Sequence, residues 1–261
     1  MNRPTHRSAE RRAALAAAQR EHERHPQAPE PLFRLCRLLL EAGDPAVNAL
    51  LPRLERFPDF DAGWIELGET LLRLKHPQGA RAAFSRPLHR GSPPVRAVLG
   101  DARALLDLGQ RSEAAALLES RGVAWPRDAS ILCERGRLLY AAGALAAAHL
   151  ALEAATAHDP QAAEAWFRLG LVHQDSGRPE QAAKAYRRAL EARPQMYQAA
   201  LNLGIALQDT GALDAALDAY RTTLRLEPRC YNRVAQALIS ASTGRLWLSS
   251  AALRRTLLGD G

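Results

Sequence analysis

Residues 163–194, AEAWFRLGLVHQDSGRPEQAAKAYRRALEARP, contain the pattern that decides the fold. Apolar residues recur at helical spacing before Gly177 and resume after it, which predicts two amphipathic helices joined by a short turn. Pro194 ends the second helix, because proline has no backbone N–H and its ring clashes with the preceding helical turn. The stretch therefore predicts one helical hairpin.

The same pattern recurs along the chain with a period of 34 residues. Prolines and glycines follow this period in one phase: Pro126, Pro160, Pro194 and Pro228, and Gly109, Gly143, Gly177 and Gly211. Two residue types that keep one period indicate tandem repeats of a structural unit. We number the positions within a repeat from 1, with repeats that begin at Asp61, Val95, Ala129, Ala163 and Tyr197.

Within each repeat, the residue sizes suit two packed helices. Position 8 is glycine or alanine and position 20 is always alanine, while positions 4, 7 and 24 are mostly large and apolar. Small residues let two antiparallel helices approach closely, and the large residues fill the space beside that contact. We therefore expect the aromatic and alanine stripes to form the core.

These residues resemble the tetratricopeptide repeat. The family has Trp, Leu-Gly, Ala, Phe and Pro at this period, and this chain has Trp166, Leu169 with Gly170, Ala182, Tyr186 and Pro194 at the matching positions. The resemblance implies an all-α, right-handed superhelical solenoid of antiparallel helix pairs, with about five clear repeats and degenerate repeats at both ends.

The repeats divide the chain into consecutive segments. Pro52 interrupts the second helix of the first, degenerate repeat, and we expect Gly244 to break the C-terminal pair, with Ser249 or Ser250 capping a last helix through Leu258 and Trp247 packing as a cap. The expected segments are a basic N-terminal segment with a capping helix (1–26), a degenerate repeat (27–60), five repeats (61–94, 95–128, 129–162, 163–196 and 197–230) and a divergent C-terminal capping helix pair (231–261).

Composition favours an intracellular helical protein. The net charge of +7 arises at the two ends, since residues 27–228 carry 24 basic and 24 acidic side chains. A basic groove for nucleic acid would need excess charge along the repeats, so we expect no specific nucleic-acid partner. No stretch approaches the roughly 18 to 20 apolar residues of a membrane span. The odd, dispersed cysteines Cys36, Cys133 and Cys230 favour a cytoplasmic protein, and the excess of arginine over lysine favours a bacterial source.

Motifs that carry catalytic chemistry are missing from the sequence. It has no phosphate-binding GxxxxGK[ST] loop and no GxGxxG, HExxH or GxSxG motif. His22 and His25 lack a third metal ligand, His173 fits a packed core position, and Cys133 has no neighbouring histidine in sequence. We therefore expect a protein that is not an enzyme and uses no cofactor or metal.

The resemblance also indicates where a ligand would bind. In tetratricopeptide proteins the first helices of successive pairs line a concave surface that binds peptides, and this implies that positions 2, 5, 6, 9 and 12 face a groove. The expected groove residues are Arg96, Leu99, Arg103, Cys133, Arg137, Tyr140, Phe167, Arg168, Leu171, Gln174, Leu201, Asn202, Ile205 and Gln208. Leu106, Glu134, Glu164 and Gln198 belong to the same stripe.

The arginines and aromatic residues of this stripe suggest the chemistry of the partner. Arg103 and Arg137 share position 9 and favour a carboxylate, unless acids such as Glu134 neutralise them, while Tyr140 and Phe167 suit an apolar anchor. We expect a protein or peptide ligand that is acidic and carries a large apolar residue. The Lys and Asn residues that clamp chaperone tails and the Asn ladder of sugar transferases are both missing.

Three functions remain open after the sequence analysis. The first is a non-enzymatic adaptor or scaffold that binds a peptide or helix of another protein. The second is a regulatory or substrate-recruiting module of a separate enzyme, such as a transferase or oxygenase. The third is a self-assembling scaffold, a homo-oligomer in which a terminal helix of one molecule occupies the groove of another.

Overall fold

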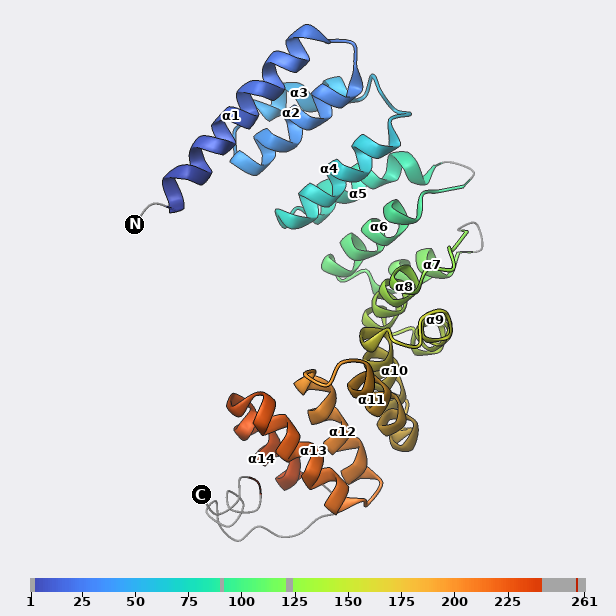
Figure 1. Ribbon diagram of the computed structural model, residues 1–261. Helices are drawn as coiled ribbons and strands as arrows, with labels where there is room; N and C mark the ends of the chain where they lie inside the picture. The colour runs from blue at the N-terminus through green and yellow to red at the C-terminus, as the bar shows by residue number, and fades with distance from the viewer. Residues whose placement is uncertain (1–2, 90–91, 121–123, 241–256, 258–261) are drawn as a thin grey trace. The chain divides into compact units, whose positions relative to one another are not determined.

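The protein is all-helical. The computed structural model describes residues 3–89, 92–120, 124–240 and 257, and in these ranges it contains fourteen α-helices, one short 3₁₀ helix and no strand (Figure 1). The expected all-α architecture of paired helices is confirmed. The chain forms two compact units, Met1–Ala124 and Trp125–Gly261, which are described separately.

The first unit begins with a single helix that packs on the first hairpin. Helix α1 (Arg3–Arg24) contacts α2 and lies within the segment 1–26, for which the sequence analysis expects a capping helix. The other helices of this unit are α2 (Pro29–Ala42), α3 (Val47–Leu54), α4 (Asp61–Arg73), α5 (Pro77–Leu88), α6 (Val95–Asp107) and α7 (Arg111–Glu119).

Pro52 does not interrupt the degenerate repeat as the sequence analysis expects. It lies inside α3, which continues to Leu54. A proline inside a helix removes one backbone hydrogen bond and crowds the preceding turn.

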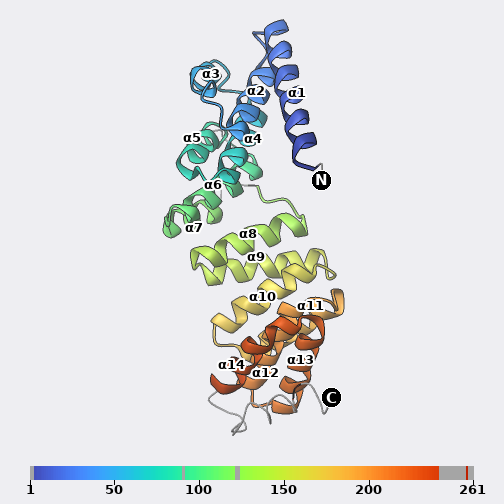
Figure 2. The ribbon, with the colours of Figure 1, turned by 90° about the vertical axis from the view of Figure 1, so that its left-hand side faces the viewer.

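The second unit contains three complete hairpins and a final helix (Figure 2). Each hairpin contacts the next, and the first helices α8 and α10 also contact each other directly. The helices are α8 (Ala129–Ala142), α9 (Leu145–His158), α10 (Ala163–Asp175), α11 (Pro179–Ala192), α12 (Tyr197–Asp209), α13 (Leu213–Leu226), the 3₁₀ helix η1 (Pro228–Cys230) and α14 (Tyr231–Ser240).

The turn inside each hairpin needs a left-handed backbone. Four regularly spaced glycines, at position 15 of their repeats, have positive φ angles: Gly109, Gly143, Gly177 and Gly211. In the repeat that begins at Asp61 this position is Lys75, whose φ is 62°. A side chain in this conformation crowds its own backbone, so Lys75 keeps the turn at an energetic cost.

Close packing inside each hairpin joins position 8 to position 24. A Cβ atom added to Gly170 would lie 2.4 Å from Cε1 of Tyr186, and one added to Gly204 would lie 2.4 Å from Cε1 of Tyr220. Phe84 and Leu152 cover Gly68 and Gly136 in the same way. The bulky residue of the second helix therefore uses the space that a missing side chain leaves on the first.

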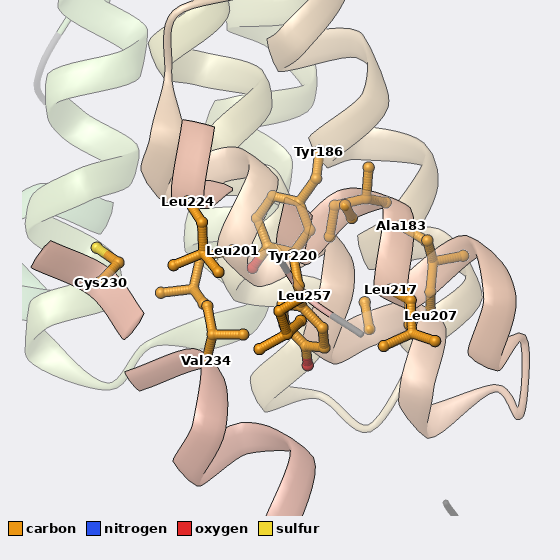
Figure 3. Close-up of a cluster of buried hydrophobic side chains, with 14 of the residues drawn as sticks. Ala183, Tyr186, Leu201, Leu207, Leu217, Tyr220, Leu224, Cys230, Val234 and Leu257 are labelled. Carbon is orange, nitrogen blue, oxygen red and sulfur yellow. The ribbon is translucent and has the colours of Figure 1, made fainter. Parts of the chain in front are cut away.

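Helix α14 covers the end of the last hairpin. Val234 is fully buried, and together with Leu257 it joins the apolar cluster around Leu201, Tyr220 and Leu224 (Figure 3). Ala237 and Leu238 pack against the same cluster. The expectations for Gly244, Trp247, Ser249, Ser250 and Leu258 lie outside the described residues.

None of the described helices has the length and apolar character of a membrane span.

Candidate functional site

Three of the predicted groove residues belong to helix α6 of the first unit. Arg96 makes a bidentate ion pair with Glu69 of α4, with both carboxylate oxygens 2.9 Å from its Nη2. Leu99 is half-buried and Arg103 is exposed. A ligand that used Arg96 would have to compete with Glu69.

Nine predicted residues lie on the first helices of the second unit and are all half-buried. Helices α8 and α10 contact each other, and side chains of α10 pack against the cluster that contains α12. We call the half-buried predicted residues of these three helices the first-helix face. Its residues are Cys133, Arg137, Tyr140, Phe167, Arg168, Leu171, Gln174, Asn202 and Ile205.

Leu201 and Gln208 do not belong to this surface, although the sequence analysis includes them. Their exposed fractions are 1% and 2%. Leu201 lies in the same buried cluster as Val234 of α14, and the amide nitrogen of Gln208 donates a hydrogen bond of 3.4 Å to the carbonyl oxygen of Ala237. Helix α14 thus covers positions that earlier repeats leave open.

The arginines of the first-helix face are neutralised by acids on their own helices. Arg137 makes two hydrogen bonds of 2.6 Å to Glu134, and Nη2 of Arg168 lies 2.5 Å from Oε1 of Glu164. All four charges act on Cys133, and burial raises the pKa of its thiol to about 11. The face therefore has balanced charge around an unreactive thiol, because Glu134 neutralises Arg137, one of the two outcomes that the sequence analysis leaves open.

Polar side chains connect neighbouring helices at the far end of this face. The hydroxyl group of Tyr140 donates a hydrogen bond of 2.6 Å to Oδ2 of Asp175. Burial, together with this carboxylate, raises the pKa of Tyr140 to about 12. Tyr140 therefore stays neutral at physiological pH and joins α8 to α10.

The centre of the face is apolar. Phe167, Leu171 and Ile205 pack one side against the buried cluster, and the Phe167 ring lies 5.9 Å from that of Tyr186 at an angle of 45°. Because all three are only half-buried, their other sides remain accessible. The result is a fixed apolar strip between polar margins.

The structure also has a surface pocket, which the sequence analysis does not predict. It lies between α9, α10 and α11 and has a volume of about 510 Å³. Its lining residues are Glu153, Trp166, Leu169, His173, Gln181, Lys184, Ala185, Arg187, Arg188 and Glu191. The sequence offers one signal for it, since Lys184 and Arg187 recur at helical spacing on an otherwise ordinary second helix.

His173 is packed inside the protein, as the sequence analysis expects. It is 9% exposed, and its ring meets that of His149 edge to face at 5.0 Å. Burial is the main cause that lowers the pKa of His173, and His149 and Arg178 act in the same direction. Among the described residues, no group of three or more His, Cys, Asp or Glu side chains is placed to hold a metal ion.

The geometry is that of a helical repeat protein, built from stacked antiparallel hairpins. A family model described as the tetratricopeptide repeat matches residues 133–174 and 168–229. Residues 133–229 therefore carry tetratricopeptide repeats, and the resemblance seen in the sequence is confirmed.

Solved structures show the same fold. A crystal structure of MamA is 22% identical, covers 66% of this chain and 94% of its own, and has a TM-score of 0.55. MamA from Desulfovibrio magneticus RS-1 is 19% identical over 66% of this chain and 97% of its own, with a TM-score of 0.56. YrrB, described as a TPR protein with an unusual peptide-binding site, is 17% identical over 71% of this chain and 95% of its own, with a TM-score of 0.58.

No curated protein matches the chain. Tetratricopeptide repeat proteins are generally non-catalytic interaction modules, so the family and the fold suggest a scaffold for protein–protein interaction.

Proposed function

We propose that this protein is a non-enzymatic adaptor whose first-helix face binds a peptide or helix of a partner protein. The observation that carries the proposal is the apolar strip of Phe167, Leu171 and Ile205, which is held from behind by the core and open in front. A few well-packed anchors, most often aromatic residues or arginine, supply most of the free energy of binding at protein interfaces. YrrB, a TPR protein with a peptide-binding site, has the same fold and supports this reading.

The partner segment should carry at least one large apolar residue that reaches Phe167. Arginine side chains at the margins, Arg137 and Arg168, are held by Glu134 and Glu164 through partly exposed ion pairs. Such pairs contribute only about 0 to 1 kcal/mol, so a partner's carboxylate or backbone carbonyl can replace the glutamate at little cost. An acidic partner is therefore compatible with this face, but its main anchor is apolar.

A peptide selection tests the proposal. A phage-displayed peptide library is selected on the full chain, and the enriched peptides are measured against an Arg137→Ala, Phe167→Ala double variant. We expect the dissociation constant to rise at least tenfold, with the helix content measured by circular dichroism unchanged, because neither side chain is fully buried.

The matched control also removes one arginine and one apolar residue. Arg221 on α13 and Leu150 on α9 are both exposed and lie outside the first-helix face. An Arg221→Ala, Leu150→Ala variant should bind the selected peptides as the wild type does. Full binding by the Arg137→Ala, Phe167→Ala variant would refute the assignment of this face.

A further inference from the structure

The pocket between α9, α10 and α11 is an open hollow at the surface. Its volume of about 510 Å³ lies within the range of roughly 300 to 1,000 Å³ that ligand sites occupy. Trp166 and Leu169 form an apolar wall, and the Trp166 indole N–H donates a hydrogen bond of 2.9 Å to the carbonyl oxygen of Pro160. This hydrogen bond fixes the indole ring, so the wall is already formed before a ligand arrives.

The rim of the pocket carries positive charge without internal partners. Arg188 is paired with Glu191 at 3.0 Å, and Glu153 lies 3.4 Å from Nδ1 of His149. Lys184 and Arg187 are both exposed and make no ion pair with another described residue. They lie three residues apart on α11, and side chains at this spacing share one helix face.

One lining residue of the pocket carries a polar atom that has no hydrogen-bond partner. His173 lines the pocket and is only 9% exposed, and its Nδ1 has no hydrogen-bond partner. Buried polar groups are nearly always hydrogen-bonded, and each exception calls for an explanation.

We propose that this pocket is a second binding site, which takes an acidic peptide segment of a partner protein. An apolar side chain of the segment packs on Trp166 and Leu169, and flanking carboxylates pair with Lys184 and Arg187. Two cations that stand side by side along a helix suit carboxylates spaced along a chain. A single phosphate group would need donors that converge on one point.

The site is separate from the first-helix face. Helix α10 contributes to both, but through different stripes, since Trp166, Leu169 and His173 line the pocket while Phe167 and Leu171 belong to the face. An acidic segment therefore finds unpaired cations here, whereas Arg137 on the face is already held by Glu134.

The test uses the full chain and a defined probe, a fluorescein-labelled peptide with one phenylalanine between two pairs of glutamates. Fluorescence anisotropy gives the dissociation constant for the wild type and for a Lys184→Glu, Arg187→Glu variant. We expect the variant to bind at least tenfold more weakly. We also expect wild-type binding to weaken at least tenfold when the glutamates become glutamines, and severalfold when the phenylalanine becomes serine.

A control variant separates this site from general charge attraction. Arg221→Glu with Arg225→Glu reverses two exposed charges on α13 and should change the affinity less than twofold. In the wild type, the indole N–H signal of Trp166 should shift in NMR spectra as the probe is added. The proposal is overturned if the probe does not bind at 1 mM, if both charge reversals weaken it equally, or if the Trp166 signal stays in place.

Discussion

The hydroxyl group of Tyr220 donates a hydrogen bond of 2.7 Å to the side-chain oxygen of Gln208, twelve residues earlier on the partner helix of the same hairpin. Tyr186 and Gln174 make the same bond, at 2.9 Å, in the preceding repeat. In repeats where position 24 is phenylalanine or leucine, position 12 is leucine or tyrosine instead. The glutamine at position 12 thus accompanies a tyrosine that needs a partner for its buried hydroxyl group.

Removal of the tyrosine hydroxyl group should lower the free energy of unfolding most where water cannot take its place as hydrogen-bond donor. Gln208 is 2% exposed, so Tyr220→Phe leaves a buried acceptor with one bond fewer, which costs about 1 to 3 kcal/mol. Tyr186→Phe should cost less, because Gln174 is half-buried and water can reach it. Urea denaturation of the two variants measures the difference, and a larger loss for Tyr186→Phe would contradict this account of the pairs.

Gly170→Ala should destabilise the second unit. The new Cβ would meet the Tyr186 ring at 2.4 Å, and overpacking of this kind costs about 1 to 3 kcal/mol. The first atoms that the new Cβ would meet all belong to the Tyr186 side chain. Gly79→Ala is the control, since its Cβ would lie 3.5 Å from Leu71. Equal melting temperatures for the two variants would mean that position 8 is not tightly packed.

Lys75→Gly should stabilise the first unit. Its φ of 62° is unfavourable for any residue with a Cβ, and relief of that strain outweighs the extra backbone entropy of glycine, for a net gain of about 1 kcal/mol. The reverse change, Gly177→Ala, starts from a φ of 68° with no atom within 4 Å of the new Cβ. The Gly177→Ala variant should lose a similar amount of stability. Denaturation midpoints that move in the same direction for both variants would be inconsistent with backbone strain as the cause.

His173 should make the stability of the second unit depend on pH. Burial, His149 and Arg178 lower its pKa below the ordinary value of 6.5, so the unfolded chain takes up a proton before the folded chain does. The stability that neutral His173 gives the folded state is fully present above pH 6.5. It is lost as the pH falls from 6.5 to the pKa of the folded state, and below that pKa no further stability is lost. In a His173→Leu variant, the free energy of unfolding should change less between pH 7.5 and 5. An unchanged slope would exclude His173 as the titrating group.

The periodic pattern was sufficient to predict the hairpins, because Gly177 and Pro194 act locally on the backbone. The face was less predictable, because burial depends on what comes next in the stack. Leu201 and Gln208 occupy groove positions in the repeat but are covered by α14, whose residues after Pro228 no longer follow the period. The pocket was missed because residues from two repeats and three helices line it.

The spacing of charges in the sequence is compatible with pairing of the arginines on their own helices. Glu134 stands three residues before Arg137, and Glu164 four residues before Arg168, spacings that place opposite charges side by side on a helix. The sequence alone does not decide whether Glu134 neutralises Arg137. The structure decides it, with ion pairs at 2.6 and 2.5 Å.

Hydrogen–deuterium exchange of the full chain, with and without a library-selected peptide, tests most directly whether the first-helix face binds a partner segment. The account predicts slower amide exchange in α8, α10 and α12 on binding, and little change in α9 and α13. It also predicts that this protection disappears in the Arg137→Ala, Phe167→Ala variant. Protection confined to second helices, or protection that survives in the variant, would contradict the central claim.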